Sequence, residues 1–151
     1  MIQRIQTVFL FLAIIALGLF IYFPYWQALP DEAGNRMMLA AYGQVLADGT
    51  VVYGLYSLVA GLAGLVMVVM AVEIFSYKNR MRQMQLAILN SFLMIINLGL
   101  MTWFVIDLQK EYEGLFGLGL FVFALAMILN ILARRFIQKD EQLVRSMDRL
   151  R

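Results

Sequence analysis

Two residue types that build many active sites are missing from this sequence of 151 residues, which contains no cysteine and no histidine. Without cysteine there is no disulfide, no thiol nucleophile and no thiolate ligand for zinc or an iron–sulfur cluster. Without histidine the chain lacks the commonest general base, metal ligand and haem ligand. Because catalytic sites need convergent acids, bases or a metal, we expect no catalytic residue, no metal site, no cofactor and no enzyme activity.

Charged residues are scarce as well, at 15% of the chain, whereas 63% of the residues are hydrophobic. A soluble domain typically has about 25% charged and about 45–50% apolar residues. The apolar surplus lies in four blocks, each long enough to cross a bilayer core as a helix, which takes roughly 20 residues. The sequence therefore predicts one all-α membrane domain over residues 1–151, a four-transmembrane-helix bundle surrounded by the lipid bilayer. The predicted spans are about residues 5–24, 52–74, 86–106 and 115–133, with edges placed to within a few residues, and they are followed by a cytoplasmic helical tail at 134–151.

The first span is predicted to be an uncleaved anchor rather than a signal peptide. Its apolar run is longer than the core of a signal peptide, and Arg4 is the one charge in front of it. It ends in bulky residues, where signal cleavage requires small ones. The aromatic cluster at 22–26 instead resembles the belt of tyrosine and tryptophan at a membrane interface.

Lysine and arginine are distributed very unevenly among the segments between the spans. The net charge is only +2, so the overall balance indicates no nucleic-acid partner. Short segments rich in these bases stay on the cytoplasmic side of a membrane. The first and third loops hold only Arg36 and Lys110. The N-terminus, the second loop and the tail are predicted to be cytoplasmic because they hold the other bases, namely Arg4, Lys78, Arg80, Arg82, Arg134, Arg135, Lys139, Arg145, Arg149 and Arg151.

Small residues line one face of the second span, at Gly54, Ser57, Gly61 and Gly64. Their spacings of three and four residues keep them on one side of a helix. Small side chains let helix backbones approach closely in a membrane. We interpret these residues as a helix-packing face inside the bundle; the alternatives are a dimerisation face and a substrate path.

Polar side chains are few within the spans. Asn90 and Asn97 lie seven residues apart on one face of the third span, and Asn130 lies near the cytoplasmic end of the fourth. An amide in hydrocarbon is costly unless it is hydrogen-bonded. We therefore expect these amides to point into the bundle and to bind helix to helix, with Asn97 meeting a backbone carbonyl or another polar side chain.

One acid, Glu73, falls inside a span, near its cytoplasmic end. An intramembrane carboxylate is a candidate proton or cation site. The other interpretation, which we favour, is an acid that reaches toward the interface and pairs with a nearby base such as Lys78 or Arg134. Glu73, Asn90 and Asn97 together form the candidate intramembrane polar site.

The first loop, between Pro24 and Val51, is the largest segment between spans. Asp48-Gly49 between apolar runs is typical of a β-hairpin with a type I′ turn. Such a short hairpin is marginal in water and would have to lean on the bundle or a partner. Alternatively, residues 37–46 form a short amphipathic helix, and the sequence does not decide between the two. The third loop, 107–114, reads as a tight acidic turn.

The tail has the pattern of an amphipathic helix. Its apolar positions 136, 143, 147 and 150 share one helical face, and no proline or glycine ends the fourth helix at the membrane. The tail either runs on into the cytoplasm or lies on the membrane surface. It serves as a basic anchor or as a docking helix for a partner. The candidate docking residues are Leu143, Arg145, Met147, Arg149 and Leu150.

The two ends of the chain, residues 1–7 (Met-Ile-Gln-Arg-Ile-Gln-Thr) and 139–151 (Lys-Asp-Glu-Gln-Leu-Val-Arg-Ser-Met-Asp-Arg-Leu-Arg), carry a family resemblance. They resemble an uncharacterised family of short four-helix inner-membrane proteins of Bacteroidota, known as a domain of unknown function. The resemblance covers the whole chain in length and order of spans. It implies a plasma-membrane protein whose outer side faces the periplasm. It implies no activity, substrate, cofactor or site residue.

The function we favour on these grounds is a non-catalytic accessory or scaffold subunit of a larger bacterial inner-membrane complex, whose partners are other membrane-protein subunits. The alternative is a small transporter or channel built from several copies of the chain, with Glu73, Asn90 and Asn97 lining a path between them. No internal repeat or broken helix marks a midplane binding site of the kind found in transporters. The number of copies stays open in both cases.

Overall fold

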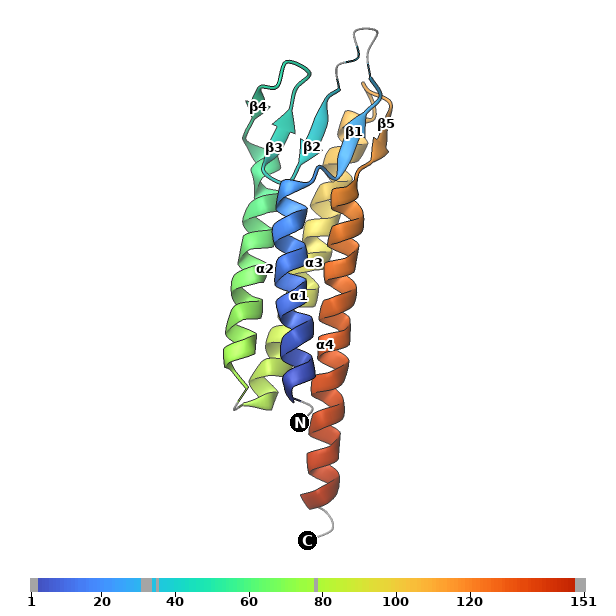
Figure 1. The fold of residues 1–151 in the computed structure, drawn as a ribbon. Helices are drawn as coiled ribbons and strands as arrows, with labels where there is room; N and C mark the ends of the chain where they lie inside the picture. The colour runs from blue at the N-terminus through green and yellow to red at the C-terminus, as the bar shows by residue number, and fades with distance from the viewer. Residues whose placement is uncertain (1–2, 31–33, 35, 78, 149–151) are drawn as a thin grey trace.

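Four long helices stand side by side and a small antiparallel sheet covers one end of them (Figure 1). The structure, a computed structural model, describes residues 3–30, 34, 36–77 and 79–148. About 70% of it is helical, and each of the four helices is long and apolar enough to cross a membrane. This confirms the predicted helical architecture. The helices are α1 (Gln3–Tyr22), α2 (Leu58–Phe75), α3 (Arg80–Leu108) and α4 (Leu118–Asp148).

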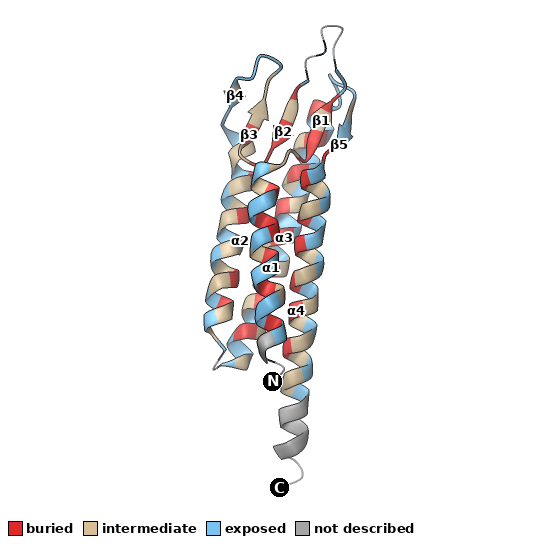
Figure 2. Cartoon of the chain, in the orientation of Figure 1, coloured by how far each residue is buried: buried red, intermediate tan, exposed pale blue. Residues whose placement is uncertain are grey.

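Each helix buries a narrow stripe of residues spaced alternately three and four apart, visible in Figure 2 as red bands along the helices. This spacing keeps the stripe on one side of a helix and suits nearly parallel packing of neighbours. The opposite faces expose large apolar side chains such as Phe92, Trp103 and Phe121. The buried stripes include Leu10, Ala13, Leu17 and Phe20 on α1; Val59, Ala63, Val66, Met70 and Glu73 on α2; Ala87, Asn90, Met94, Asn97 and Met101 on α3; and Phe123, Ala126, Asn130, Ala133 and Ile137 on α4.

The sheet is larger than the hairpin that the sequence suggested. Its strands are β1 (Trp26–Ala28), β2 (Met38–Ala40), β3 (Gly43–Val45), β4 (Val51–Val52) and β5 (Gly114–Phe116), in the spatial order β4-β3-β2-β1-β5. All neighbouring pairs are antiparallel. The hairpin of β3 and β4 confirms the hairpin interpretation, and the alternative helix at 37–46 is wrong because β2 and β3 occupy that segment.

Two of the helices begin later than predicted, because short strands occupy the residues expected to start them. The second span was expected from residue 52 and the fourth from 115, but α2 begins at Leu58 and α4 at Leu118. Residues 51–52 and 114–116 are strands, and Gly54 has a φ of 132°, which a helix cannot accommodate. Apolarity marks both a strand and a helix, so it cannot locate the boundary between them.

The turn between β3 and β4 is not the predicted type I′. That type needs a positive φ at both central residues, and Gly49 (φ 83°) is the one residue of the turn with a positive φ. The amide of Gly49 donates to the carbonyl of Leu46, and Val45 and Val51 are the last paired residues. Asp48 Oδ1 accepts bonds from the hydroxyl (2.7 Å) and the amide (2.9 Å) of Thr50, and these bonds lower the pKa of Asp48.

The sheet is attached to the bundle through close backbone contacts. The amides of Gly117 and Gly119, at the start of α4, donate to the carbonyls of Tyr25 and Pro24 at 2.9 Å each. The amide of Ala60, in the first turn of α2, donates to the carbonyl of Ala41 at 3.0 Å. These bonds satisfy helix N-terminal amides that have no partner within their own helix.

Gly119 provides a test of this attachment. A Cβ at Gly119 would collide with the backbone of Phe23 and Pro24, whereas a Cβ at Gly99 on α3 would meet nothing within 4 Å. We expect Gly119→Ala to lower the free energy of unfolding by about 1–3 kcal/mol through overpacking. Gly99→Ala, the matched control, should be neutral or stabilising, since alanine favours helix over glycine. Thermal unfolding in mild detergent, followed by tryptophan fluorescence, measures both; equal midpoints would contradict the close approach.

Candidate functional site

Polar side chains lie inside the bundle, on all four helices. Gln6 of α1, Glu73 of α2, Gln83, Asn90 and Asn97 of α3 and Asn130 of α4 are buried. They belong to the same stripes as the apolar core residues, and the expectation that the amides point inward is confirmed. Gln6 and Gln83 were not singled out from the sequence: Gln6 lies at the start of the first predicted span, and Gln83 lies just before the third.

Glu73 is the acid at the centre of this group. Its side chain is 0% exposed, and its Oε2 accepts a hydrogen bond of 2.9 Å from Nδ2 of Asn90. Nε2 of Gln83 donates to the backbone carbonyl of Glu73 at 3.0 Å. No ion pair of Glu73 with Arg134 or another base is found among residues 3–30, 34, 36–77 and 79–148, and Lys78, the other base named for this pairing, lies outside the described residues. The carboxyl group points inward to Asn90 because Glu73 belongs to the buried stripe of α2.

The other two amides join neighbouring helices. Nδ2 of Asn97 donates to the carbonyl of Val59 on α2 at 3.2 Å, which confirms the expected backbone partner. Nδ2 of Asn130 on α4 donates to Oγ of Ser91 on α3 at 3.0 Å, and that hydroxyl donates to the carbonyl of Ala87. The amides therefore connect α3 to α2 on one side and to α4 on the other.

Four oxygen atoms of this group have no hydrogen-bond partner in the described part of the chain. They are Oε1 of Glu73 and the Oδ1 atoms of Asn90, Asn97 and Asn130. A buried acceptor without a donor lowers the stability of the fold, because in the unfolded chain the same atom accepts a hydrogen bond from water. Two of the four belong to Glu73 and Asn90, which already share one bond. In this pair, one polar atom of each side chain is therefore hydrogen-bonded and the other is not.

The small residues of the second predicted span do not pack inside the bundle. Gly54 precedes α2, Ser57 lies in a 3-10 turn (Leu55–Ser57), Gly61 is exposed, and a Cβ at Gly61 or Gly64 would meet nothing within 4 Å. The predicted packing face within the bundle is therefore wrong. Spacing identifies residues that share a face but not the neighbour which that face meets, and α2 packs through the stripe from Val59 to Glu73 instead. The alternative of a dimerisation face stays a prediction.

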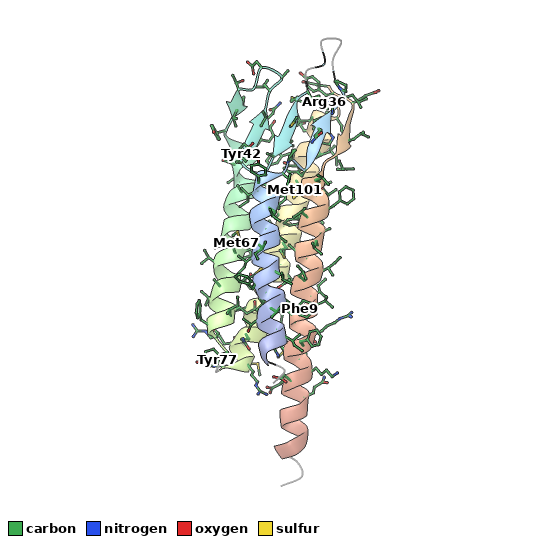
Figure 3. All side chains as sticks on the ribbon, viewed as in Figure 1. Phe9, Arg36, Tyr42, Met67, Tyr77 and Met101 are labelled. Atoms are coloured by element: carbon green, nitrogen blue, oxygen red, sulfur yellow. The ribbon has the colours of Figure 1, made fainter. Side chains whose placement is uncertain are left out.

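The beginning of the tail continues α4 without a break, as one of the two predicted arrangements requires. Phe136 stacks on Phe9 of α1, which is labelled in Figure 3, with ring centroids 5.4 Å apart. Nη1 of Arg80 donates to the carbonyl of Asp140 at 3.3 Å. The candidate docking residues lie beyond this point. Leu143, Arg145 and Met147 belong to the last turns of α4, and Arg149 and Leu150 lie outside the described residues.

The aromatic cluster after α1 is divided between surface and core. Tyr22 is exposed, as the predicted interfacial belt requires, but Tyr25 and Trp26 are buried between the sheet and the bundle. A Cβ at Gly114 of β5 would collide with the indole of Trp26, so this glycine makes room for the ring. Burial, and then the nearby Tyr56, raise the pKa of Tyr25. Alternation along β1 could have indicated the inward direction of Trp26, had the strand been recognised.

Asparagines 90 and 97 provide a matched comparison of buried amides. Asn97→Leu removes a bond to the carbonyl of Val59, whereas Asn90→Leu removes the one bond that the Glu73 carboxyl accepts in the described part of the chain. We expect Asn90→Leu to cost about 1–3 kcal/mol more unfolding free energy, because a buried polar group then loses its partner. Chemical unfolding in detergent measures the unfolding free energy of both variants. Equal losses would show that the bond from Asn90 to Glu73 contributes no more to stability than the bond from Asn97 to Val59.

Comparison with known proteins identifies a family without naming an activity. No curated protein matches the chain. The sequence model described as "Domain of unknown function (DUF4293)" matches residues 2–150. That match covers nearly the whole chain, including every helix and strand described above. The chain therefore belongs to the DUF4293 family, a family of proteins of unknown function.

Proposed function

We propose that this protein is a non-catalytic accessory or scaffold subunit of a larger protein complex in a bacterial inner membrane. The observation that carries the proposal is the enclosure of the polar side chains of the spans. Glu73, Asn90 and Asn97 are each 0% exposed, so water outside the bundle does not touch these side chains. A substrate would need such a side chain to be accessible, and here each amide donates within the bundle.

The distribution of charge supports the proposed orientation. The connection between α2 and α3, the start of α1 and the extension of α4 all lie at the end of the bundle opposite the sheet (Figure 1). Arg80, Arg82, Arg134, Arg135 and Lys139 belong to these segments. The positive-inside rule puts that end in the cytoplasm. The sheet, with Asp48, Glu111 and Glu113 beside it, would then face the periplasm, in keeping with an origin in Bacteroidota.

The extension of α4 is the part of the chain best suited to a cytoplasmic partner. The 31 residues of α4 are about 46 Å long at 1.5 Å per residue. This length exceeds a bilayer core of about 30 Å, so the last turns project beyond the membrane. Figure 1 shows this part of α4 projecting past the other helices. A projecting helix with an apolar face in its sequence fits recognition by helix packing against another subunit.

The alternative proposal, a homo-oligomeric transporter or channel, needs a polar path between copies. The residues suggested for that path, Glu73, Asn90 and Asn97, lie inside a single bundle and not on the surface that a second copy would meet. Transport through them would require the helices of one bundle to separate. No observation on the described residues favours that movement, and the scaffold proposal needs none.

Purification in mild detergent from the native membrane tests the proposed function. We expect a second membrane protein to copurify in a fixed ratio, and we expect substitution of Leu143, Met147 and Leu150 by serine to remove it while leaving the chain folded. The matched control replaces the exposed Leu125 and Ile128 of α4 by alanine within the span. Recovery of this chain alone, at any copy number, would defeat the proposal. Flux in proteoliposomes that is lost on substitution of Asn97 would favour the transporter.

A further inference from the structure

The Glu73–Asn90 pair has an unusual pattern of satisfied and unsatisfied atoms. One atom of each side chain takes part in the bond between them, from Nδ2 of Asn90 to Oε2 of Glu73. The other atom of each side chain, Oε1 of Glu73 and Oδ1 of Asn90, has no hydrogen-bond partner among the residues that the structure describes. Both remaining atoms are oxygens. Two oxygens of an ionised carboxylate and an amide cannot bond to each other, because neither carries a hydrogen.

A single proton on Glu73 resolves this pattern. A protonated carboxyl group has one O–H donor and one carbonyl acceptor, and an amide has the complementary donor and acceptor. With the proton on Oε1, the acid donates to Oδ1 of Asn90 while Oε2 continues to accept from Nδ2. The two side chains then form a closed ring with two hydrogen bonds. We propose that Glu73 and Asn90 form an intramembrane proton-binding site in which the bound proton joins Oε1 of Glu73 to Oδ1 of Asn90.

The charges around Glu73 agree with a neutral acid. An ionised carboxylate buried in a medium of low dielectric constant needs an opposite charge beside it. The elements packed against this end of α2 contribute the neutral Gln6 from α1 and the neutral Gln83 from α3 to the interior. The charged groups at this end are Arg80 and Arg82 on α3 and Arg134, Arg135, Lys139 and Asp140 on α4, and none of them forms an ion pair with Glu73 among the described residues.

A proton suits this site better than a metal ion does. Hard cations are held by several oxygen ligands around a space of their own. Glu73 and Asn90 are each 0% exposed, so other protein atoms surround both side chains and leave no room for an ion between them. In the described segments of the chain, no group of three or more acidic, histidine or cysteine residues is positioned to hold a metal. A proton needs no cavity, only the two oxygens that are left over.

The site is closest to the end of the bundle that we assign to the cytoplasm. Glu73 lies in the last turn of α2, which ends at Phe75. Gln83, whose Nε2 donates to the carbonyl of Glu73, lines a narrow gap with Gln6, Arg80, Ile137 and Asp140, and this gap has no room for a water molecule. The end of the bundle that we assign to the cytoplasm is therefore the nearer source of protons for the site.

Infrared spectroscopy of the full-length protein in mild detergent tests the bound proton directly. A protonated carboxyl group gives a C=O stretching band that an ionised one does not give. We expect this band at neutral pH in the wild type, its loss in Glu73→Gln, and its persistence in Glu113→Gln, where an exposed acid is changed as the control. Asn90→Leu should shift the band to higher frequency, because the carbonyl of Glu73 loses its donor. Absence of the band in the wild type at neutral pH, or its persistence in Glu73→Gln, would overturn the proposal.

Thermal unfolding as a function of pH gives a second readout. The folded wild type holds the proton in the closed ring, whereas the glutamate of the unfolded chain releases it above a pH of about 4–5. The unfolding temperature should therefore fall as the pH rises from that value until the folded protein also loses the proton. In Glu73→Gln the amide donates permanently to Oδ1 of Asn90, so this pH-dependent loss should disappear, whereas Glu113→Gln should keep it. If Glu73→Gln does not fold, the band shift in Asn90→Leu decides instead. Stabilisation of the wild type by sodium chloride but not by choline chloride would identify a sodium site and overturn the proton site.

Discussion

A narrow buried stripe on each helix is the constraint on which the rest of this structure depends. In each candidate span, only about a third or less of the most apolar window is buried inside the bundle. The remaining surface exposes large apolar side chains such as Phe92, Trp103 and Phe121, a pattern typical of helices that span a membrane. The acid and the asparagines of the spans are directed into the stripe, where each has few neighbours. Glu73, Asn90, Asn97 and Asn130 are such side chains, and their partners come from adjacent helices.

The sheet and the bundle depend on each other. Strands of two or three residues are too short to be stable alone. Here β1 pairs with β5, so the first and third loops form a single layer across the end of the helices. Trp26 and Tyr25 fill the space beneath this layer, and the carbonyls of Pro24, Tyr25 and Ala41 accept the free amides at the starts of α4 and α2. The sheet thus stabilises the ends of the helices that support it.

The two ends of the molecule differ in kind, and this asymmetry bears on function. One end is covered by a sheet attached through close backbone contacts at Gly114, Gly117 and Gly119. The other end carries most of the bases and the projecting part of α4, and the polar cluster of Glu73, Gln83 and Asn90 lies next to it. A scaffold that meets its partner through the extension of α4 would therefore have a proton site on the same side. The pH of that side could influence the bundle without any open path through the membrane.

The sequence by itself determined the helical class, the four apolar segments and the direction of the asparagines. Twenty apolar residues in a row and an amide among them leave few physical choices. The hairpin near Gly49 could also be predicted, because the turn needs a residue that tolerates a positive φ. The pairing of β1 with β5 could not, since it joins segments almost 90 residues apart through backbone bonds that no side-chain pattern specifies. Only the tertiary structure decided which way the small residues of the second predicted span face and which partner each buried polar residue meets. It turned Gly61 outward and joined Glu73 to Asn90, because packing between helices, and not spacing along one helix, selects the partner.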